Sequence, residues 1–398
     1  MNVIGIDVAR GKSKCALIIG DLVDKYFEIK HNRSGFSRLY NIARETKSLI
    51  VFETTGVYSS QLTQFCIQED LDFLELNPLE ASIRMAGLRR DKTDRSDSEK
   101  LAFLAINQHN LLVGRRPWDS SYEELRMLGS RYFQVTKESA RSINHLHAAL
   151  ERVFPELNDV FDLIKSTLDL RMIELFTHPD FVMGQKIDDM VEKVWSSVNH
   201  KIHHDLVVQK CEEVWHASRS SYPAVESDSI LVEITQSYCN EIRNFNAEKN
   251  SIKKKMINLA RKEPELKIIN SIPGAGELSV ALLIGYVGDI RRFLTYKQMN
   301  AFVGIDLHRI QSGGLKNDHI NRRGQKNARY IMFDMVRSML RNQATIDNHI
   351  VDYYYKLKKG PHPKSDMVAM IACINRLNRT IVNLVRTNQI YDYFKTAH

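Results

Sequence analysis

Two stretches of the chain repeat mostly apolar side chains at spacings of three or four residues. The first comprises Leu125, Leu128, Tyr132, Val135, Ser139, Ser142, Leu146, Ala149 and Val153, and the second comprises Leu231, Ile234, Tyr238, Ile242, Phe245, Ile252, Met256 and Leu259, with Lys249 as its polar break. Such patterns predict two long helices packed along one seam. We therefore expect an antiparallel helical arm; an ordinary helical bundle has the same periodicity and is the alternative.

The arm divides the chain into three parts. A length of 398 residues is typical of two or three domains. We expect an α/β domain at residues 1–112, the arm at 113–262 with a helical insertion at about 156–227, and a basic, mostly helical module at 263–398.

The first part alternates strand and helix patterns. Strands are predicted at Val3–Val8, Ser13–Ile19, Asp21–His31, Ser48–Phe52 and Leu71–Leu76, and helices follow the third and fourth of them. The first three strands are expected to be antiparallel. This order is similar to that of a ribonuclease-H-like (RuvC-like) domain.

Four carboxylates occupy positions that suit a divalent cation. Asp7 lies within an apolar strand and Glu53 ends another, while Asp94 and Asp97 open a helix at a spacing that projects both from one face. Oxygen ligands of this kind suit Mg²⁺ or Mn²⁺, which polarise phosphoryl groups. Helix capping is the simpler explanation for Asp94 and Asp97 taken alone.

Basic side chains lie beside these acids in the sequence. Arg89, Arg90, Lys92 and Arg95 are expected to carry a phosphate backbone toward the cations.

The third part concentrates the positive charge of the chain. Residues 309–341 hold eight Lys and Arg against two Asp, whereas the whole chain has a net charge of +8. The candidates for nucleic-acid contact are Arg309, Lys316, Arg322, Arg323, Lys326 and Arg329. Gly274 and Gly276 form a turn between two helices, which predicts either a phosphate-binding helix–hairpin–helix or a plain connection.

Ser312 precedes two glycines within this basic segment. Taken alone, it is compatible with an ordinary turn. The alternative is a nucleophilic hydroxyl that a phosphodiester can approach closely because the glycines carry no side chains.

Several motifs together resemble one family. The segments IGIDVARGKS, VFETTGVY and KTDRSDSEKLA, followed by the 272–276 hairpin, VGIDLHR, SGG and RRGQKNAR, are similar to DEDD transposases of bacterial insertion sequences. This family includes Piv-type DNA invertases and bridge-RNA-guided recombinases. The resemblance covers residues 1–110 and 263–345; the proline usual near the VGIDLHR segment is absent.

The resemblance implies a metal-dependent DNA recombinase. Asp7, Glu53, Asp94 and Asp97 would be its metal-binding acids, and Ser312 its nucleophile, forming a covalent phosphoserine intermediate. It further implies donor and target DNA, a structured bridge RNA as guide, and a homodimer or tetramer in which acids and serine come from different protomers. The alternatives are a Piv-like invertase without an RNA guide, a RuvC-like nuclease using water, and a non-enzymatic nucleic-acid-binding protein.

The remaining composition is that of a cytoplasmic protein. The five cysteines are dispersed without a CxxC pair, which favours reduced, buried thiols. No apolar run approaches the roughly 20 residues of a membrane span, and we expect no signal peptide.

Overall fold

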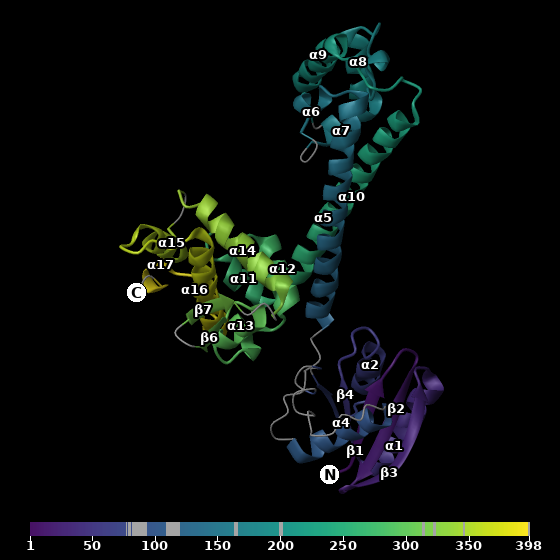
Figure 1. Ribbon diagram of the computed structural model, residues 1–398, viewed down its shortest axis with the longest axis vertical. Coiled ribbons are helices and arrows are strands. Elements are labelled where there is room, and N and C mark those ends of the chain that lie inside the picture. The colour runs from purple at the N-terminus through teal and green to yellow at the C-terminus, as the bar shows by residue number, and fades with distance from the viewer. Residues whose placement is uncertain are drawn as a thin grey trace. The chain divides into compact units, whose positions relative to one another are not determined.

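The structure is a computed structural model that describes residues 1–76, 78, 81, 94–108, 120–162, 166–198, 202–312, 315–320, 324–344 and 347–396 (Figure 1). The side chains of residues 94–96, 108, 120, 307–319 and 396 are outside this description. Contacts divide the chain into two compact units, Met1–Pro117 and Trp118–His398.

A five-stranded sheet forms the centre of the first unit. Its strands are β1 (Val3–Val8), β2 (Lys12–Ile19), β3 (Leu22–Lys30), β4 (Leu49–Glu53) and β5 (Phe73–Leu76), in the order β3-β2-β1-β4-β5. β1, β2 and β3 are antiparallel neighbours, whereas β4 and β5 run parallel to β1. The five predicted strands and the antiparallel pairing of the first three are confirmed.

Helices cover both faces of this sheet. α1 (Arg33–Thr46) and α2 (Ser60–Gln68) share an apolar cluster with Ile4 and Ile6, whereas α4 (Asp94–Gln108) packs on the face of Val3 and Val51. The alternation of side chains along β1 separates these two clusters. Asn32 caps α1, because its side chain accepts a hydrogen bond from the Gly35 amide at 2.9 Å.

The two heptad stretches form paired helices in the second unit. α5 (Ser120–Val153) and α10 (Ile230–Ala260) lie side by side, as Figure 1 shows. Arg131 pairs with Glu248 at 2.7 Å, and Ser142 donates a hydrogen bond to Glu241 at 2.8 Å. Contact positions rise along one helix as they fall along the other, so the predicted antiparallel pair is confirmed.

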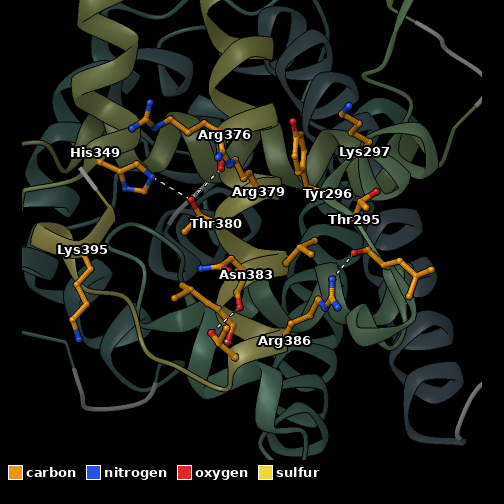
Figure 2. Close-up of a pocket in the computed structure, with 14 residues that line it drawn as sticks. Thr295, Tyr296, Lys297, His349, Arg376, Arg379, Thr380, Asn383, Arg386 and Lys395 are labelled. Carbon is orange, nitrogen blue, oxygen red and sulfur yellow. Dashed lines mark hydrogen bonds between the residues drawn. The ribbon is translucent and has the colours of Figure 1, made fainter. Parts of the chain in front are cut away.

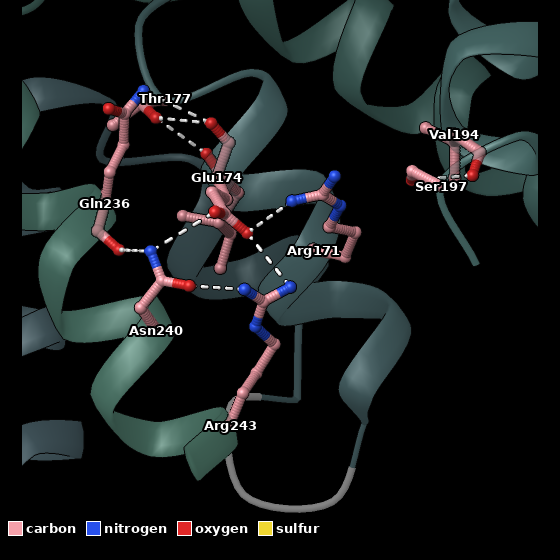
Figure 3. Close-up of polar contacts among 9 residues, drawn as sticks. Arg171, Glu174, Thr177, Val194, Ser197, Gln236, Asn240 and Arg243 are labelled. Carbon is pink, nitrogen blue, oxygen red and sulfur yellow. Dashed lines mark hydrogen bonds and ion pairs between the residues drawn. The ribbon is translucent and has the colours of Figure 1, made fainter. Parts of the chain in front are cut away.

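The helices between α5 and α10 form a separate apolar cluster. They are α6 (Leu157–Val160), α7 (Thr167–Leu175), η2 (Pro179–Phe181), α8 (Ile187–Trp195) and α9 (His204–Ser220). Glu174 attaches α7 to α10, because its carboxylate pairs with Arg243 at 3.1 Å and accepts from Asn240 at 3.2 Å (Figure 3). Arg171, on α7 itself, pairs with the same carboxylate at 2.8 Å. The insertion is helical, as predicted.

The apolar helix α12 lies within residues 264–396 and packs against α11 and α14 of this region and against α5 and α10. The elements are α11 (Pro264–Asn270), α12 (Glu277–Val287), η3 (Ile290–Arg292), α13 (Tyr296–Val303), β6 (Leu307–Ser312), β7 (Leu315–Ile320), α14 (Lys326–Arg341), α15 (His349–Lys359), α16 (Asp366–Thr387) and α17 (Tyr393–Thr396). The residues of α12 from Val280 to Val287 are all buried. Gly285 lets α12 approach α5, since a Cβ there would lie 2.8 Å from the Leu125 carbonyl carbon.

One apolar cluster joins this region to the arm. Leu125 and Val135 of α5 and Met256 of α10 belong to the same cluster as helices α11 to α16. The contacts therefore place the arm and the C-terminal helices in one unit, whereas the three-part division from the sequence stays a prediction.

Two further findings concern composition. All five cysteines are buried and free, and burial raises the pKa of Cys66 and Cys373 to about 12, so these thiols are protonated at neutral pH. Within the described part of the chain, no helix is long and apolar enough to cross a membrane.

Candidate active site

Asp7 and Glu53 lie at the ends of adjacent strands. β1 and β4 pair in parallel from Val3 opposite Leu49 to Ile6 opposite Phe52. One further step along this register places Asp7 opposite Glu53, the last residue of β4. Both positions belong to the sheet face covered by α4, and both residues are half-buried. The sheet therefore brings these two acids together.

A glycine sets how closely α4 approaches β1. A Cβ on Gly5 would overlap the carbonyl oxygen of Ser98 and lie 2.8 Å from the Ala102 nitrogen. Backbone meets backbone at this crossing, so no larger residue fits without moving the helix. Asp7 lies two residues beyond Gly5 on β1, and Asp97 directly precedes Ser98 on α4. The crossing thus positions the start of α4 near the strand-end acids.

The two helix acids occupy the first turn of α4. The helix begins at Asp94, and its next acid, Asp97, is half-buried and pairs with Lys100 at 3.3 Å. Carboxylates at this position also stabilise the helix N-terminus. The side chain of Asp94 lies outside the described residues.

Lys14 is a charged neighbour of the acids that the sequence reasoning missed. It is the Cα partner of Asp7 across the β1–β2 ladder and is half-buried. Directly opposite residues of an antiparallel pair point to the same face, so Lys14 belongs to the face of Asp7. The first two predicted strands, antiparallel and separated by only four residues, would have placed Lys14 opposite Asp7.

The buried Glu75 supports the segment that follows Glu53. Thr54 donates a hydrogen bond from its hydroxyl to the Glu75 carboxylate at 3.0 Å, and its amide donates to the Leu76 carbonyl at 3.0 Å. The backbone at the end of β4 is therefore bound to the end of β5, which restricts the position of Glu53.

The donor set of these acids suits a hard divalent cation. Asp7, Glu53 and Asp97 supply carboxylate oxygens, which Mg²⁺ and Mn²⁺ prefer. Among the described side chains, no group of three or more His, Cys, Asp and Glu residues is arranged to hold a metal ion. Of the predicted basic residues near the acids, Arg89, Arg90 and Lys92 lie outside the described residues, as does the side chain of Arg95.

Ser312 ends a β-strand in the second unit. The antiparallel hairpin of β6 and β7 pairs Leu307 with Ile320 at its base and Ser312 with Leu315 at its tip. This hairpin was not expected within a mostly helical module. Polar and turn-forming residues interrupt the apolar alternation by which a strand is recognised from sequence. The hydrogen bonds of the hairpin form only when its two strands pair. The side chains of Ser312, Arg309 and Lys316, and all of Arg322 and Arg323, lie outside the description.

Close backbone contacts hold the base of this hairpin. A Cβ on Gly324 would lie 2.6 Å from the Cα atom of Gly304, and the Gln325 amide donates to the Phe302 carbonyl at 2.7 Å. Arg329 donates to the carbonyls of Val303 and Gly304 at 3.0 and 3.2 Å. Its guanidinium therefore stabilises the C-terminal end of α13, which sequence reasoning had assigned to nucleic acid alone. Lys326, at the start of α14, is exposed.

The two glycines of the 272–276 turn have different environments. Gly274 has a φ of +87°, and a Cβ on it would lie 2.8 Å from the Met339 Cα atom, so close packing against α14 explains this glycine. Gly276 precedes α12 and faces open space. Glu277 opens α12 and pairs with Arg261 at 3.1 Å, so a carboxylate already lies at this helix N-terminus. Phosphate binding here stays a prediction.

Comparisons with known families bear on both regions. A family model described as a transposase, the DEDD transposase of the IS110 type, matches residues 4–155. A second model, described as the transposase IS116/IS110/IS902 family, matches residues 266–351. Together the matches span more than half of the chain. The chain belongs to the IS110 family of DEDD transposases. No curated protein matches it.

Membership in this family establishes the general activity. An IS110-family transposase of an insertion sequence binds DNA, and cuts and rejoins it. The first match contains Asp7, Glu53, Asp94 and Asp97, and the second contains Ser312. DEDD transposases generally use a divalent metal ion, which agrees with the carboxylate donors described above.

Proposed function

We propose that this transposase recombines DNA through a covalent phosphoserine intermediate, with Ser312 as nucleophile and Asp7, Glu53, Asp94 and Asp97 as metal-binding acids. The observation that carries the proposal is the β1–β4 register, which sets Asp7 opposite Glu53 beneath the start of α4. A bound Mg²⁺ or Mn²⁺ would neutralise charge on the scissile phosphate.

Ser312 would perform the covalent step. Its hydroxyl oxygen gives up its proton, attacks phosphorus and forms a phosphoester, while the bond from phosphorus to a deoxyribose oxygen breaks and that oxygen takes up a proton. Rejoining is the reverse attack by a deoxyribose hydroxyl on the phosphoserine. A place at the end of a hairpin next to two glycines favours close approach of DNA. Arg309, Lys316, Arg322 and Arg323 would stabilise the additional negative charge.

We also propose a fold for the first unit and the partners of the protein. The sheet order and strand directions support a ribonuclease-H-like (RuvC-like) fold for residues 1–112. A structured bridge RNA would select donor and target DNA by base pairing, while the protein contacts the backbone. The paired helices α5 and α10 offer a surface for a homodimer or tetramer, in which acids and serine act from different protomers.

Replacement of single groups tests the chemistry. Ser312→Ala removes the attacking oxygen, so covalent protein–DNA adducts and strand exchange should both disappear, while DNA binding is retained. Asp7→Asn should still bind DNA, but its rate of DNA cleavage should fall by a factor of roughly a hundred or more. Adduct formation is measured by denaturing electrophoresis of labelled DNA.

Cleavage that persists in Ser312→Ala without an adduct would instead favour a RuvC-like nuclease that uses water. Sequencing the RNA that co-purifies with the wild-type protein separates the guided recombinase from a Piv-like invertase. A discrete structured RNA supports the guide, and its absence supports the invertase.

A further inference from the structure

A basic cavity lies in the second unit, apart from the serine-bearing hairpin. It has a volume of about 800 Å³ and is formed by the start of α13, the start of α15, one side of α16 and the C-terminal α17 (Figure 2). Its charged and polar lining includes Lys297, Arg376, Arg379, Arg386 and Lys395. None of the fourteen residues shown to line it is acidic. The charged side chains of the lining are therefore all basic.

Three of these five cations already have partners. Arg386 donates to the Leu294 carbonyl, and Lys395 pairs with Asp392 at 3.6 Å. The Arg376 guanidinium lies 4.9 Å from the centre of the Tyr353 ring. These contacts restrict the three side chains, and among the three only Lys395 pairs with an acid within the described part of the chain.

Lys297 and Arg379 have no acidic partner among the described residues. Both are exposed, and Arg379 lies over the Tyr296 ring at 5.8 Å, a contact that orients its guanidinium without neutralising it. Figure 2 shows Lys297 and Arg379 on either side of Tyr296. Two uncompensated cations in one cavity repel each other, and a bound anion would relieve this repulsion.

The wall behind these cations is fixed by a buried hydrogen-bond network. Thr380 donates to the Arg376 carbonyl at 3.0 Å and therefore accepts from His349 Nε2 at 3.2 Å, while Tyr391 contacts His349 Nδ1 at 2.8 Å. All of these contacts are satisfied by a neutral imidazole. The wall is thus rigid, which lowers the cost of positioning the cations for a ligand.

Three of the five cations lie on one face of α16, together with Asn383. Arg376, Arg379, Asn383 and Arg386 repeat along α16 at spacings of three, four and three residues, which places them on a single stripe. At 1.5 Å per residue, the stripe spans about 15 Å. Successive phosphates of one DNA strand are about 3.4 Å apart along the duplex axis, so the stripe is long enough to contact more than one.

We propose that this cavity binds the phosphodiester backbone of a nucleic acid, with Lys297 and Arg379 as its principal contacts. The inference rests on the proposed function only in assuming that a nucleic acid is handled by this protein. Arginine provides paired N–H donors for phosphate oxygens, and the lysine adds a point charge. The cavity adjoins the start of α13 whereas the hairpin of Ser312 follows its end, so the two would contact different phosphates.

Binding measurements on the full chain test this proposal. The double variant K297Q/R379Q should weaken binding about tenfold at moderate salt and reduce the slope of log affinity against log salt concentration by about two. Two probes are used separately, a DNA duplex of arbitrary sequence and a structured RNA of similar length. A loss confined to one probe identifies the source of the phosphates, and a loss with both assigns a shared site.

The matched control is K186Q/R152Q, which also removes one exposed lysine and one exposed arginine, near α8 and in α5. Its affinity and salt slope should equal those of the wild type. Acetylation of surface lysines in the saturated complex provides a second readout, in which Lys297 should be protected and Lys186 should stay reactive. Unchanged affinity of K297Q/R379Q for both probes, or full reactivity of Lys297 in the complex, overturns the proposal.

Failure of this proposal is distinct from failure of the recombinase mechanism. K297Q/R379Q should still form the Ser312 adduct at saturating DNA, whereas Ser312→Ala should not form it at any concentration. An intact adduct with unchanged binding by K297Q/R379Q therefore rejects the cavity alone.

Discussion

The strand ends that carry Asp7 and Glu53 and the hairpin that carries Ser312 position the proposed functional residues in different ways. Asp7 and Glu53 belong to central strands with helices on both faces of the sheet. Ser312 belongs to a two-stranded hairpin held at its base by Gly304, Gly324 and Arg329. A two-stranded hairpin has little stability of its own, so its orientation depends on that base. The acids therefore depend on packing of a whole layer, whereas the serine depends on a few local contacts.

The largest effect on stability is expected from Gly5→Ala. The added Cβ overlaps the Ser98 carbonyl, and neither backbone can move without separating α4 from β1. The free energy of unfolding of the first unit should fall by about 4 kcal/mol, and metal-dependent cleavage should be lost with it. Denaturant unfolding followed by far-UV circular dichroism measures this. Gly11→Ala is the control: its φ is +76° but its Cβ meets no atom within 4 Å, so it should cost about 1 kcal/mol. Equal losses of unfolding free energy in the two variants would show that close contact between α4 and β1 at Gly5 does not limit stability.

Acidification should destabilise the second unit through His349. Burial, together with the nearby Arg376 charge, lowers the pKa of His349 from 6.5 to about 4. Between these pH values the unfolded chain binds more protons than the folded one. The contribution of His349 to the free energy of unfolding is therefore fully present above pH 6.5 and is lost as the pH falls toward 4. The loss attributable to this group at pH 4 is about 3 kcal/mol.

Denaturant unfolding at several pH values, compared between wild type and His349→Gln, isolates the histidine from the other titrating groups. The variant should be less stable at neutral pH, but its stability should depend less steeply on pH between 6.5 and 4. Parallel pH curves for the two proteins would show that the histidine network does not control this transition.

A smaller effect on stability, but a large one on chemistry, is expected from Arg329→Met. Loss of the donors to the Val303 and Gly304 carbonyls should cost about 1–2 kcal/mol, because both carbonyls belong to the end of α13. Adduct formation by Ser312 should fall more than this destabilisation explains, since the hairpin base loosens. Arg337→Met, an exposed arginine of the same helix, is the matched control for unfolding and adduct yield. Normal adduct formation by Arg329→Met would show that the hairpin does not need this base.

The sequence predicted the acid-bearing region more completely than the serine-bearing one. Apolar alternation around Asp7 and before Glu53 is a local signal, and the resulting strands pair in the expected order. The β6–β7 hairpin has no such signal, because Gln311, Lys316 and Asn317 interrupt any apolar pattern. Arg329 was assigned to nucleic acid from its charge, since its carbonyl partners are brought to it only by the packing of α13 against α14.

The sequence by itself determined the five strands of the first unit, the two long helices α5 and α10, and the family. These properties depend on periodicity and on motifs that each lie within a short segment. Only the tertiary structure decided that Gly5 sets the approach of α4 and that α13 and α16 enclose a basic cavity. Each of these requires residues distant in the chain to meet, and such contacts arise from packing of complete elements rather than from any local pattern.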